Sequence, residues 1–284
     1  MIIQKKKISR YLTIVVVLLV GLMVSGCRQQ DPQARAEEAI RQARWRETLL
    51  EYGYPEIVIE EMEPVLKEQI CRDQVYFHSA EVRYMSSNHG EREVVLTYVG
   101  PSGHVEHPFR EKEEPEYDFC GMLVTGICYV DGQLGGELEH ILCSFLYRWE
   151  NLPEDREEDE LQITWDGDLL WSLDDSFWVS WSQITKEGRR EGLGANNRAA
   201  RVGRGTATSY TRFRYMDRFG VQGLAGAVWL QLRPLEGVDL TKDWPRIQGS
   251  YQYQCEKGWM NEYQAYDVSL DLRFFSGEEI YEGN

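Results

Sequence analysis

The feature that most restricts the fold of this chain is a two-residue period in hydrophobicity that begins near residue 75 and continues almost to its end. It is clearest in residues 141–149, where Ile141, Cys143, Phe145, Tyr147 and Trp149 occupy alternate positions. Successive side chains of a β-strand point to opposite faces, so this pattern predicts a strand with one apolar face. Similar alternation predicts further strands near residues 82–84, 94–98, 123–130, 161–165, 169–171, 177–181, 211–215, 228–232, 251–255 and 268–274. About ten short strands without intervening helices indicate a mainly β fold, an antiparallel β-sandwich or an open barrel.

Two Asp-Gly pairs are expected to turn the chain between strands. Asp131-Gly132 follows the strand near residues 123–130, and Asp166-Gly167 separates the strands near residues 161–165 and 169–171. Asp-Gly is favoured in two-residue hairpin turns because both central residues take positive φ angles. We therefore predict a tight β-hairpin at Asp166-Gly167.

Residues before the first strand have a helical pattern. Asp31-Pro32 is typical of an N-cap followed by proline at the first helical position. The segment Gly53-Tyr54-Pro55 ends this helix, and a second helix is expected over residues 57–70 with a restart at Pro64. One face of the first helix carries an apolar stripe, which we expect to pack on the sheet: Ala36, Ala39, Ile40, Ala43 and Leu50. The expected domains are residues 1–26, a signal peptide; 27–72, a tether and helical hairpin; and 73–284, one or two β-rich domains.

The N-terminal segment has the three parts of a secretory signal. Lys5, Lys6, Lys7 and Arg10 precede an apolar run over residues 11–24. This run is about 14 residues long, whereas a permanent membrane-spanning helix needs about 20. We therefore expect an export signal and not a membrane helix.

The residues that follow resemble a known processing site. Val24-Ser25-Gly26-Cys27 resembles the lipobox of the bacterial lipoprotein class. The resemblance implies that signal peptidase II cuts before Cys27 and that the thiol of Cys27 carries a diacylglyceryl group with acyl chains such as palmitate. Two chains would anchor the protein stably on the extracytoplasmic face of the cell membrane. The alternative is an uncleaved anchor with a chance cysteine.

The charge of the chain limits its partners. The formal charge is −16, and removal of residues 1–26 with their four positive side chains makes it −20. Such an acidic, exported protein is not expected to bind nucleic acid. The expected partners are the membrane, through lipid on Cys27, and a cell-wall polymer or carbohydrate.

Five cysteines follow Cys27, and an odd number cannot all pair within one chain. Export permits disulfides, but buried free thiols are an equally good interpretation. The connectivity is therefore open, and no CxxC spacing indicates a redox or zinc site. The five are Cys71, Cys120, Cys128, Cys143 and Cys255.

A group of tryptophans gives the first candidate binding site. Trp165 and Trp181 are in phase with apolar neighbours and are expected in the core. Trp178 points the other way and, with Trp171, is a candidate platform for a sugar ring. A core role for the whole group is the alternative.

A basic segment over residues 186–205 gives the second candidate. It contains six Lys or Arg residues against two Glu, together with five glycines. Arg189, Arg190, Arg198 and Arg201 are candidates to bind anionic polymer or lipid headgroups. A mobile loop without a ligand is the alternative.

Other polar groups give no catalytic or metal site, and no cofactor is expected. His104 and His107 are three apart and would point to opposite faces of a strand. His78 and His140 lie in strand-like sequence and are interpreted as hydrogen-bonded sheet residues. The acidic runs near residues 111–118 and 154–160 lack the spacing of a calcium loop. A carboxylate pair for glycoside hydrolysis is conceivable among four residues that turn chemistry explains equally well: Asp166, Asp168, Asp174 and Asp175.

Residues 146–165 combine a Tyr-Arg-Trp strand, a Leu-Pro stop and a strand ending in Trp-Asp. This stretch resembles uncharacterised secreted proteins and lipoproteins of Gram-positive bacteria, and the resemblance implies no activity. The sequence thus favours a non-catalytic, membrane-anchored lipoprotein with a binding or cell-envelope role. The alternative is a tethered hydrolase that acts on cell-wall glycan or peptide.

Overall fold

The computed structural model describes residues 32–86, 90–99, 104–106, 118–150, 156–174, 176–184, 190–196, 200–212, 223–240, 242–243, 245–257 and 260–271. The chain forms two compact units, residues 1–44 and residues 45–284. The expected signal peptide and Cys27 lie outside the described residues. Among the described helices, none is both long enough and apolar enough to cross a bilayer.

The helices of the described residues match the two helical segments that the sequence predicts, the second of which is divided at Pro64. They are α2 (Pro32–Glu51), α3 (Glu56–Glu61) and α4 (Pro64–Asp73). Pro64 stands at the start of α4, where its missing N–H costs nothing, and Gln74 ends α4 in the left-handed conformation with φ 51°.

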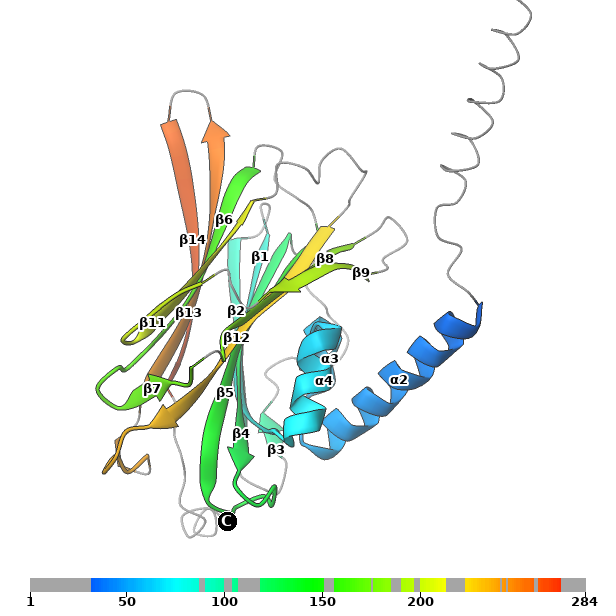
Figure 1. Cartoon of the computed structure of the whole chain (residues 1–284). Coiled ribbons are helices and arrows are strands. Elements are labelled where there is room, and N and C mark those ends of the chain that lie inside the picture. The colour runs from blue at the N-terminus through cyan, green and yellow to red at the C-terminus, as the bar shows by residue number, and fades with distance from the viewer. Residues whose placement is uncertain are drawn as a thin grey trace, which may run out of the picture. The chain divides into compact units, whose positions relative to one another are not determined.

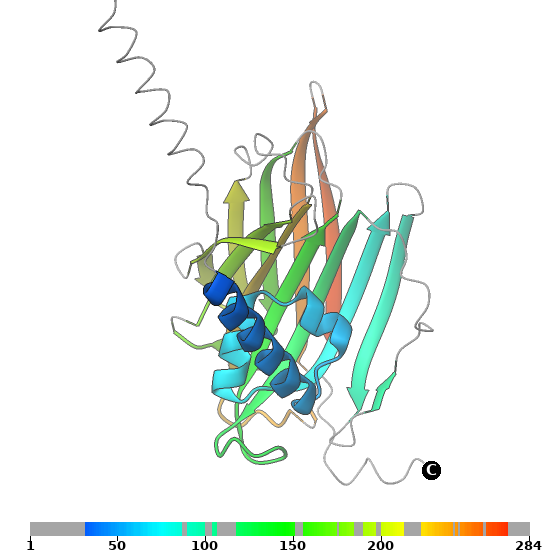
Figure 2. The ribbon, with the colours of Figure 1, turned by 90° about the vertical axis from the view of Figure 1, so that its right-hand side faces the viewer.

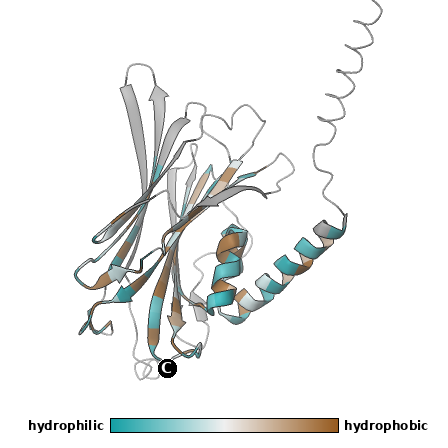
Figure 3. Ribbon diagram, in the orientation of Figure 1, coloured by the Kyte–Doolittle hydropathy of each residue, from teal (hydrophilic) through white to brown (hydrophobic). Residues whose placement is uncertain are grey.

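The predicted apolar stripe of α2 is not the buried face. Ile40 is 55% exposed and Leu50 is 39% exposed, whereas Leu49 is fully buried. Trp45 and Tyr52 are partly buried, so the face that packs inward carries Trp45, Leu49 and Tyr52, which are spaced i, i+4 and i+7. The expectation was wrong because it followed small and aliphatic residues and passed over the aromatic ones. Figure 3 shows that α2 is mainly hydrophilic.

The strands form two antiparallel sheets, which confirms the mainly β fold (Figure 1). The larger, nine-stranded sheet has the order β3-β2-β1-β4-β5-β12-β8-β9, and β7 also pairs with β12. Its strands are β1 (Tyr76–Ser86), β2 (Gly90–Val99), β3 (His104–Glu106), β4 (Phe119–Tyr129), β5 (Leu138–Trp149), β7 (Leu170–Ser172), β8 (Trp178–Ile184), β9 (Arg190–Asn196) and β12 (Gly223–Pro234). The smaller, five-stranded sheet has the order β10-β11-β6-β13-β14. Its strands are β6 (Arg156–Trp165), β10 (Ala200–Gly203), β11 (Thr206–Arg212), β13 (Arg246–Lys257) and β14 (Met260–Asp271).

The predicted hairpin at Asp166-Gly167 is wrong, because the chain changes sheets there. β6 belongs to the smaller sheet, where it pairs with β11 on one side and with β13 on the other. β7 pairs with β12 in the larger sheet. The Asp-Gly pair still makes a tight turn, since the carboxylate of Asp166 accepts a hydrogen bond of 3.0 Å from the backbone N–H of Asp168.

The two sheets enclose the sandwich core, a cluster of buried apolar side chains. Phe145 is fully buried in it, and a Cβ added to Gly249 of β13 would come within 2.2 Å of the Phe145 ring. Phe119, Trp149 and Tyr251 form neighbouring aromatic pairs with ring centroids 4.8–6.1 Å apart. The alternation that predicted β5 therefore marks the residues that face the smaller sheet.

The opposite face of the larger sheet is covered by α3, α4 and the last residues of α2 (Figure 2). Leu49, Val58, Leu66 and Ile70 of the helices join Leu142 and other sheet residues in a second buried cluster, which we call the helix-covered cluster. The central strands β4, β5 and β12 of the larger sheet are thus buried on both faces, which explains why β4 is buried along almost its whole length. The expected packing of helices on the sheet is confirmed for α3, α4 and the end of α2.

Candidate functional site

A row of polar and aromatic side chains crosses the helix-covered face of the larger sheet on strands β4, β5, β12 and β7. Cys128 of β4 pairs with His140 of β5, and Arg233 of β12 pairs with Trp171 of β7. Arg233 follows Leu232, which pairs with Ile141, so Arg233 lies beside the start of β5. Paired residues point to the same face of a sheet. The register therefore brings together residues from four separate parts of the sequence.

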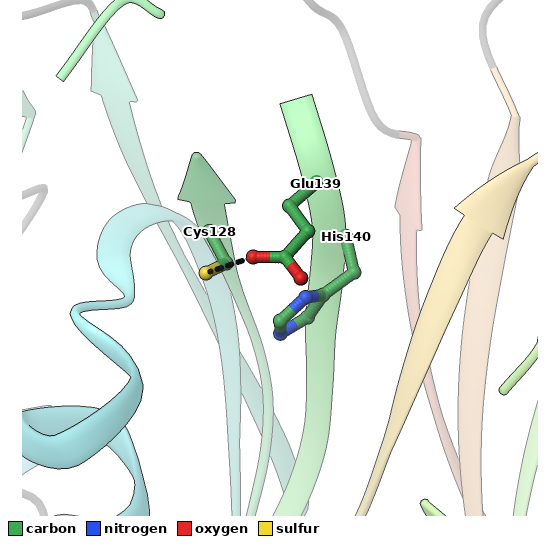
Figure 4. A group of neighbouring side chains, drawn as sticks. All are labelled: Cys128, Glu139 and His140. Atoms are coloured by element: carbon green, nitrogen blue, oxygen red, sulfur yellow. Dashed lines mark hydrogen bonds between the residues drawn. The ribbon is translucent and has the colours of Figure 1, made fainter. Parts of the chain in front are cut away.

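An irregularity in β5 places two consecutive side chains in this row. The register between β4 and β5 shifts between Cys128 and Tyr129, so that Cys128 pairs with His140 while Tyr129 pairs with Leu138. Glu139 is the extra residue of this β-bulge. Bulges re-aim side chains that regular pleating would send to the other face. As a result Glu139 and His140 both lie next to Cys128 (Figure 4).

The three side chains form a compact cluster. One donor atom from each of Cys128, Glu139 and His140 lies within 4.8 Å of the other two. The Sγ of Cys128 donates to the carboxylate of Glu139 at 3.5 Å and to the backbone oxygen of Asp73 at 3.1 Å. Asp73 is the last residue of α4, so its carbonyl belongs to the negative end of the helix dipole.

Burial and neighbouring acids act on the titration of this cluster. Burial, followed by the Glu139 and Asp73 carboxylates, raises the pKa of the Cys128 thiol to about 12, and Arg233 opposes the shift. The pKa of His140 is lowered overall, because the effect of burial exceeds the opposing effect of the same two carboxylates. At neutral pH the cluster therefore holds a neutral thiol and a neutral imidazole.

The imidazole of His140 lacks hydrogen-bond partners among the described residues. The side chain is 5% exposed, and neither Nδ1 nor Nε2 has a partner. An unpaired polar group in this position costs about 1–3 kcal/mol. The expectation that His140 is a hydrogen-bonded sheet residue was therefore wrong, whereas His78 does contact Ser79 and Thr125 through Nδ1.

The cluster is poorly suited to nucleophilic catalysis. A reactive cysteine needs a lowered pKa and a base that takes its proton. The pKa of Cys128 is raised, and its nearest side-chain acceptor is a carboxylate instead of the imidazole. The thiol of Cys128 therefore stays protonated at neutral pH in this arrangement.

The four tryptophans of the candidate group lie in different environments. Trp165 is buried in the sandwich core and Trp181 packs against it, which confirms their expected positions. Trp178 is partly buried and stacks on Trp229, with ring centroids 6.3 Å apart and planes 8° apart. Trp171 is 44% exposed. Of these four, Trp171 offers the most accessible ring.

The basic segment is more regular than a mobile loop. Residues 190–196 form β9 in the larger sheet, and residues 200–203 form β10 in the smaller one. Gly205, with φ 80°, makes the turn into β11. Arg204 donates to the backbone oxygen of Gly167 and pairs with Asp168. Arg189 and Arg198 lie outside the described residues, as do the side chains of Arg190 and Arg201.

The remaining candidates do not join the row. Asp166 and Asp168 stabilise the turn and its ion pair with Arg204, and Asp174 is exposed; Asp175 lies outside the described residues. His107 also lies outside them, beyond the short strand β3. Four of the five cysteines are free thiols, so the free-thiol interpretation holds for Cys71, Cys120, Cys128 and Cys143. The side chain of Cys255 is outside the described part.

Comparison with known proteins gives only remote similarities. No family model matches the sequence, and no curated protein sequence matches it. Among solved structures, the collagen-binding subdomain of the Enterococcus faecalis surface protein ACE is 10% identical, with a TM-score of 0.31, over 50% of this chain and 92% of that chain. The major pilin subunit BcpA of Bacillus cereus is 11% identical, with a TM-score of 0.32, over 69% and 65%. The Streptococcus pneumoniae pilin RrgB is 5% identical, with a TM-score of 0.33, over 66% and 44%. At these values no ligand or partner is carried over to this chain.

Proposed function

We propose that the chain is a lipoprotein held on the extracytoplasmic face of the cell membrane through Cys27, and that it acts at the cell envelope by binding, without catalysis. The observation that carries the proposal is the order of a basic segment, an apolar run of about 14 residues and the lipobox-like Val24-Ser25-Gly26-Cys27. The compartment supplies cell-wall polymers as ligands.

The binding role draws support from the environment of Trp171. Its ring is 44% exposed, and Arg233 is its partner across β7 and β12. An exposed aromatic face stacks on the apolar face of a sugar ring, and a guanidinium donates to hydroxyl, carboxylate or phosphate oxygens. We therefore propose a carbohydrate or anionic cell-wall polymer as the ligand of this surface, with Trp171 replacing Trp178 as the platform.

The tethered hydrolase has less support. Hydrolysis of a glycosidic bond needs two carboxylates about 5–9 Å apart on either side of the bond. Asp166 and Asp168 lie in one turn, where each is already engaged, by a backbone N–H and by Arg204 respectively.

The anchor is tested by metabolic labelling with an alkyne fatty acid. The wild-type protein should carry the label and fractionate with membranes, and a Cys27→Ala precursor should not carry the label. Labelling of the Cys27→Ala protein would contradict the anchor.

The binding surface is tested with the mature lipoprotein in detergent, applied to purified peptidoglycan and to teichoic acid. Trp171→Ala should weaken binding by about tenfold or more, because an aromatic anchor commonly contributes that much. Leu134→Ala is the matched control, since Leu134 is 46% exposed in the β4–β5 connection. Equal binding by wild type and Trp171→Ala would exclude Trp171 as the platform.

The basic segment is tested separately with a variant in which four arginines are replaced by glutamine: Arg189, Arg190, Arg198 and Arg201. A contribution from these charges predicts weaker binding to teichoic acid and a smaller loss of binding when salt is raised. Unchanged binding at both salt concentrations would remove the segment from the ligand surface.

A further inference from the structure

The structure assigns a second site to this protein: we propose that Cys128, Glu139 and His140 bind a divalent metal ion of the borderline class, for which Zn²⁺ is the best match. This inference goes beyond the proposed envelope function and does not depend on it. It rests on how the β4–β5 pairing places three donor atoms within 4.8 Å of one another.

The donor set selects the kind of ion. A thiolate sulfur, an imidazole nitrogen and a carboxylate oxygen are the ligands that zinc takes in proteins, and three of them leave one tetrahedral position for water or another molecule. Calcium and magnesium need several oxygen ligands, and this cluster offers one carboxylate. Ligand atoms on a zinc ion lie roughly 3.5 Å apart. Small side-chain rotations would close the present cluster to that spacing.

The unpaired imidazole is an independent indication of a ligand. His140 is nine-tenths buried or more, and both of its ring nitrogens lack partners among the described residues. A metal ion would occupy one nitrogen with a strong bond and would hold the imidazole neutral, as its burial already favours. Figure 4 shows the ring on the same side of β5 as the Glu139 carboxylate and facing Cys128 of β4.

The surroundings favour a positive charge. The Asp73 backbone carbonyl at the C-terminal end of α4 lies 3.1 Å from the Cys128 sulfur, and a carboxylate oxygen of Glu139 lies 3.5 Å from it. Arg233 is the opposing charge. Once the thiol releases its proton to solvent on binding, the Cys128 thiolate and the Glu139 carboxylate face the guanidinium of Arg233, while the Asp73 carboxylate is paired with Arg72.

Arg233 is a positioning residue for this site. Its Nε donates to the backbone oxygen of Glu139 at 2.9 Å, and its terminal nitrogen lies 3.4 Å from Oε1 of the same residue. The other carboxylate oxygen, Oε2, faces the Cys128 sulfur. Outer residues that orient a ligand in this way commonly change metal affinity by about 10–100-fold.

The experiment uses the mature lipoprotein in detergent, stripped of metal with a chelator and then dialysed against Zn²⁺ or Co²⁺. We expect one zinc ion per chain by elemental analysis. Co²⁺ should give the near-ultraviolet absorption of a cobalt–thiolate bond. Cys128→Ser should abolish this absorption, and His140→Gln should lower zinc affinity more than Arg233→Gln does, for which we expect about 10–100-fold.

Matched controls come from the same chain. Cys71→Ser changes another free thiol, on α4, and His78→Gln changes a hydrogen-bonded histidine of the same sheet. Both should bind zinc as the wild type does, and so should Trp171→Ala, which separates this site from the proposed polymer surface. Wild-type protein without stoichiometric zinc, or equal zinc binding by Cys128→Ser and Cys71→Ser, would overturn the proposal.

A measurement on the wild-type protein alone tests the site even if the variants do not fold. Zinc should slow the alkylation of Cys128 by a maleimide, as mapped by peptide mass spectrometry, while Cys71 serves as an internal reference. Alkylation of Cys128 at the same rate with and without zinc would overturn the proposal.

Discussion

The two faces of the larger sheet are buried in different ways. Toward the smaller sheet, the sandwich core is built from aromatic and aliphatic side chains, and a neutral hydrogen bond of 2.9 Å within it runs from Trp149 Nε1 to the hydroxyl of Tyr251. Toward the helices, polar bonds join α3 and α4 to the strands. Glu63 accepts from Ser182, Glu61 pairs with Arg148, and Gln69 accepts from Trp229 Nε1.

This difference indicates separate roles for the two faces. Apolar burial is non-directional and scales with area, so it holds the two sheets together without specifying many contacts. Buried polar pairs are directional and costly when broken, so they set where the helices lie on the sheet. The Cys128–Glu139–His140 cluster belongs to the polar face, where buried donors and acceptors already occur.

The largest expected effect comes from the sandwich core. Phe145→Ala should lower the free energy of unfolding by about 3–5 kcal/mol, because it removes a fully buried ring and leaves a cavity against Gly249. Urea denaturation of the mature lipoprotein measures the change. A loss below about 1 kcal/mol would mean that the core collapses into the space and is less tightly packed than the structure shows.

The next effect tests the polar face. Glu63 is 2% exposed and lies 2.7 Å from the Ser182 hydroxyl. A double-mutant cycle with Glu63→Ala and Ser182→Ala should give a coupling energy of about 1.5–3 kcal/mol, as expected for a hydrogen bond to a charged group. Additive single and double variants would show that the helices are positioned by apolar contacts alone.

A smaller effect is expected from the neutral bond in the sandwich core. Tyr251→Phe removes the acceptor of Trp149 Nε1 and keeps the ring, so the free energy of unfolding should fall by about 0.5–1.5 kcal/mol. A larger loss than for the Glu63–Ser182 pair would reverse the comparison between the faces. Thermal and urea unfolding of the same preparations provide the measurement.

The smallest effect concerns α2. Ile40→Gln should change the free energy of unfolding by no more than about 0.5 kcal/mol, because Ile40 is exposed. Leu49→Ala, at a fully buried position of the same helix, should cost about 2–5 kcal/mol. Similar losses of stability in the two variants would indicate that the apolar stripe predicted from the sequence is the buried face of α2.

The sequence could predict elements wherever one pattern dominated locally. The alternation in residues 141–149 predicted β5, and the breaks at Gly53-Tyr54-Pro55 and Pro64 predicted within a few residues where the helices end and begin. The prediction of a hairpin at Asp166-Gly167 was wrong. The residues of a turn indicate that the chain reverses there, but they do not determine which sheet the next strand joins. The prediction of a mobile loop over the basic segment was also incomplete. Its glycines disfavour strands, and yet it contributes two short edge strands, β9 and β10.

The Cys128–His140 pairing shows why the candidate metal site was missed. A two-residue turn at Asp131-Gly132 would place Cys128 opposite Gly135, whereas the connection runs from Val130 to Glu137. The β-bulge at Glu139 then moves the register by one more residue. Register depends on the whole loop and on cross-strand packing, and neither can be read from one strand.

The sequence by itself determined the two-residue period, the helix boundaries, the negative charge and the lipobox-like Cys27 on which the proposed anchor rests. Each depends on neighbouring residues or on summed composition. Only the tertiary structure decided that the central strands of the larger sheet are buried on both faces, that Trp171 is the accessible tryptophan of its group, and that Cys128, Glu139 and His140 meet. Those outcomes depend on which strands pair and in which register, and pairing is settled by the packing of segments far apart in the chain.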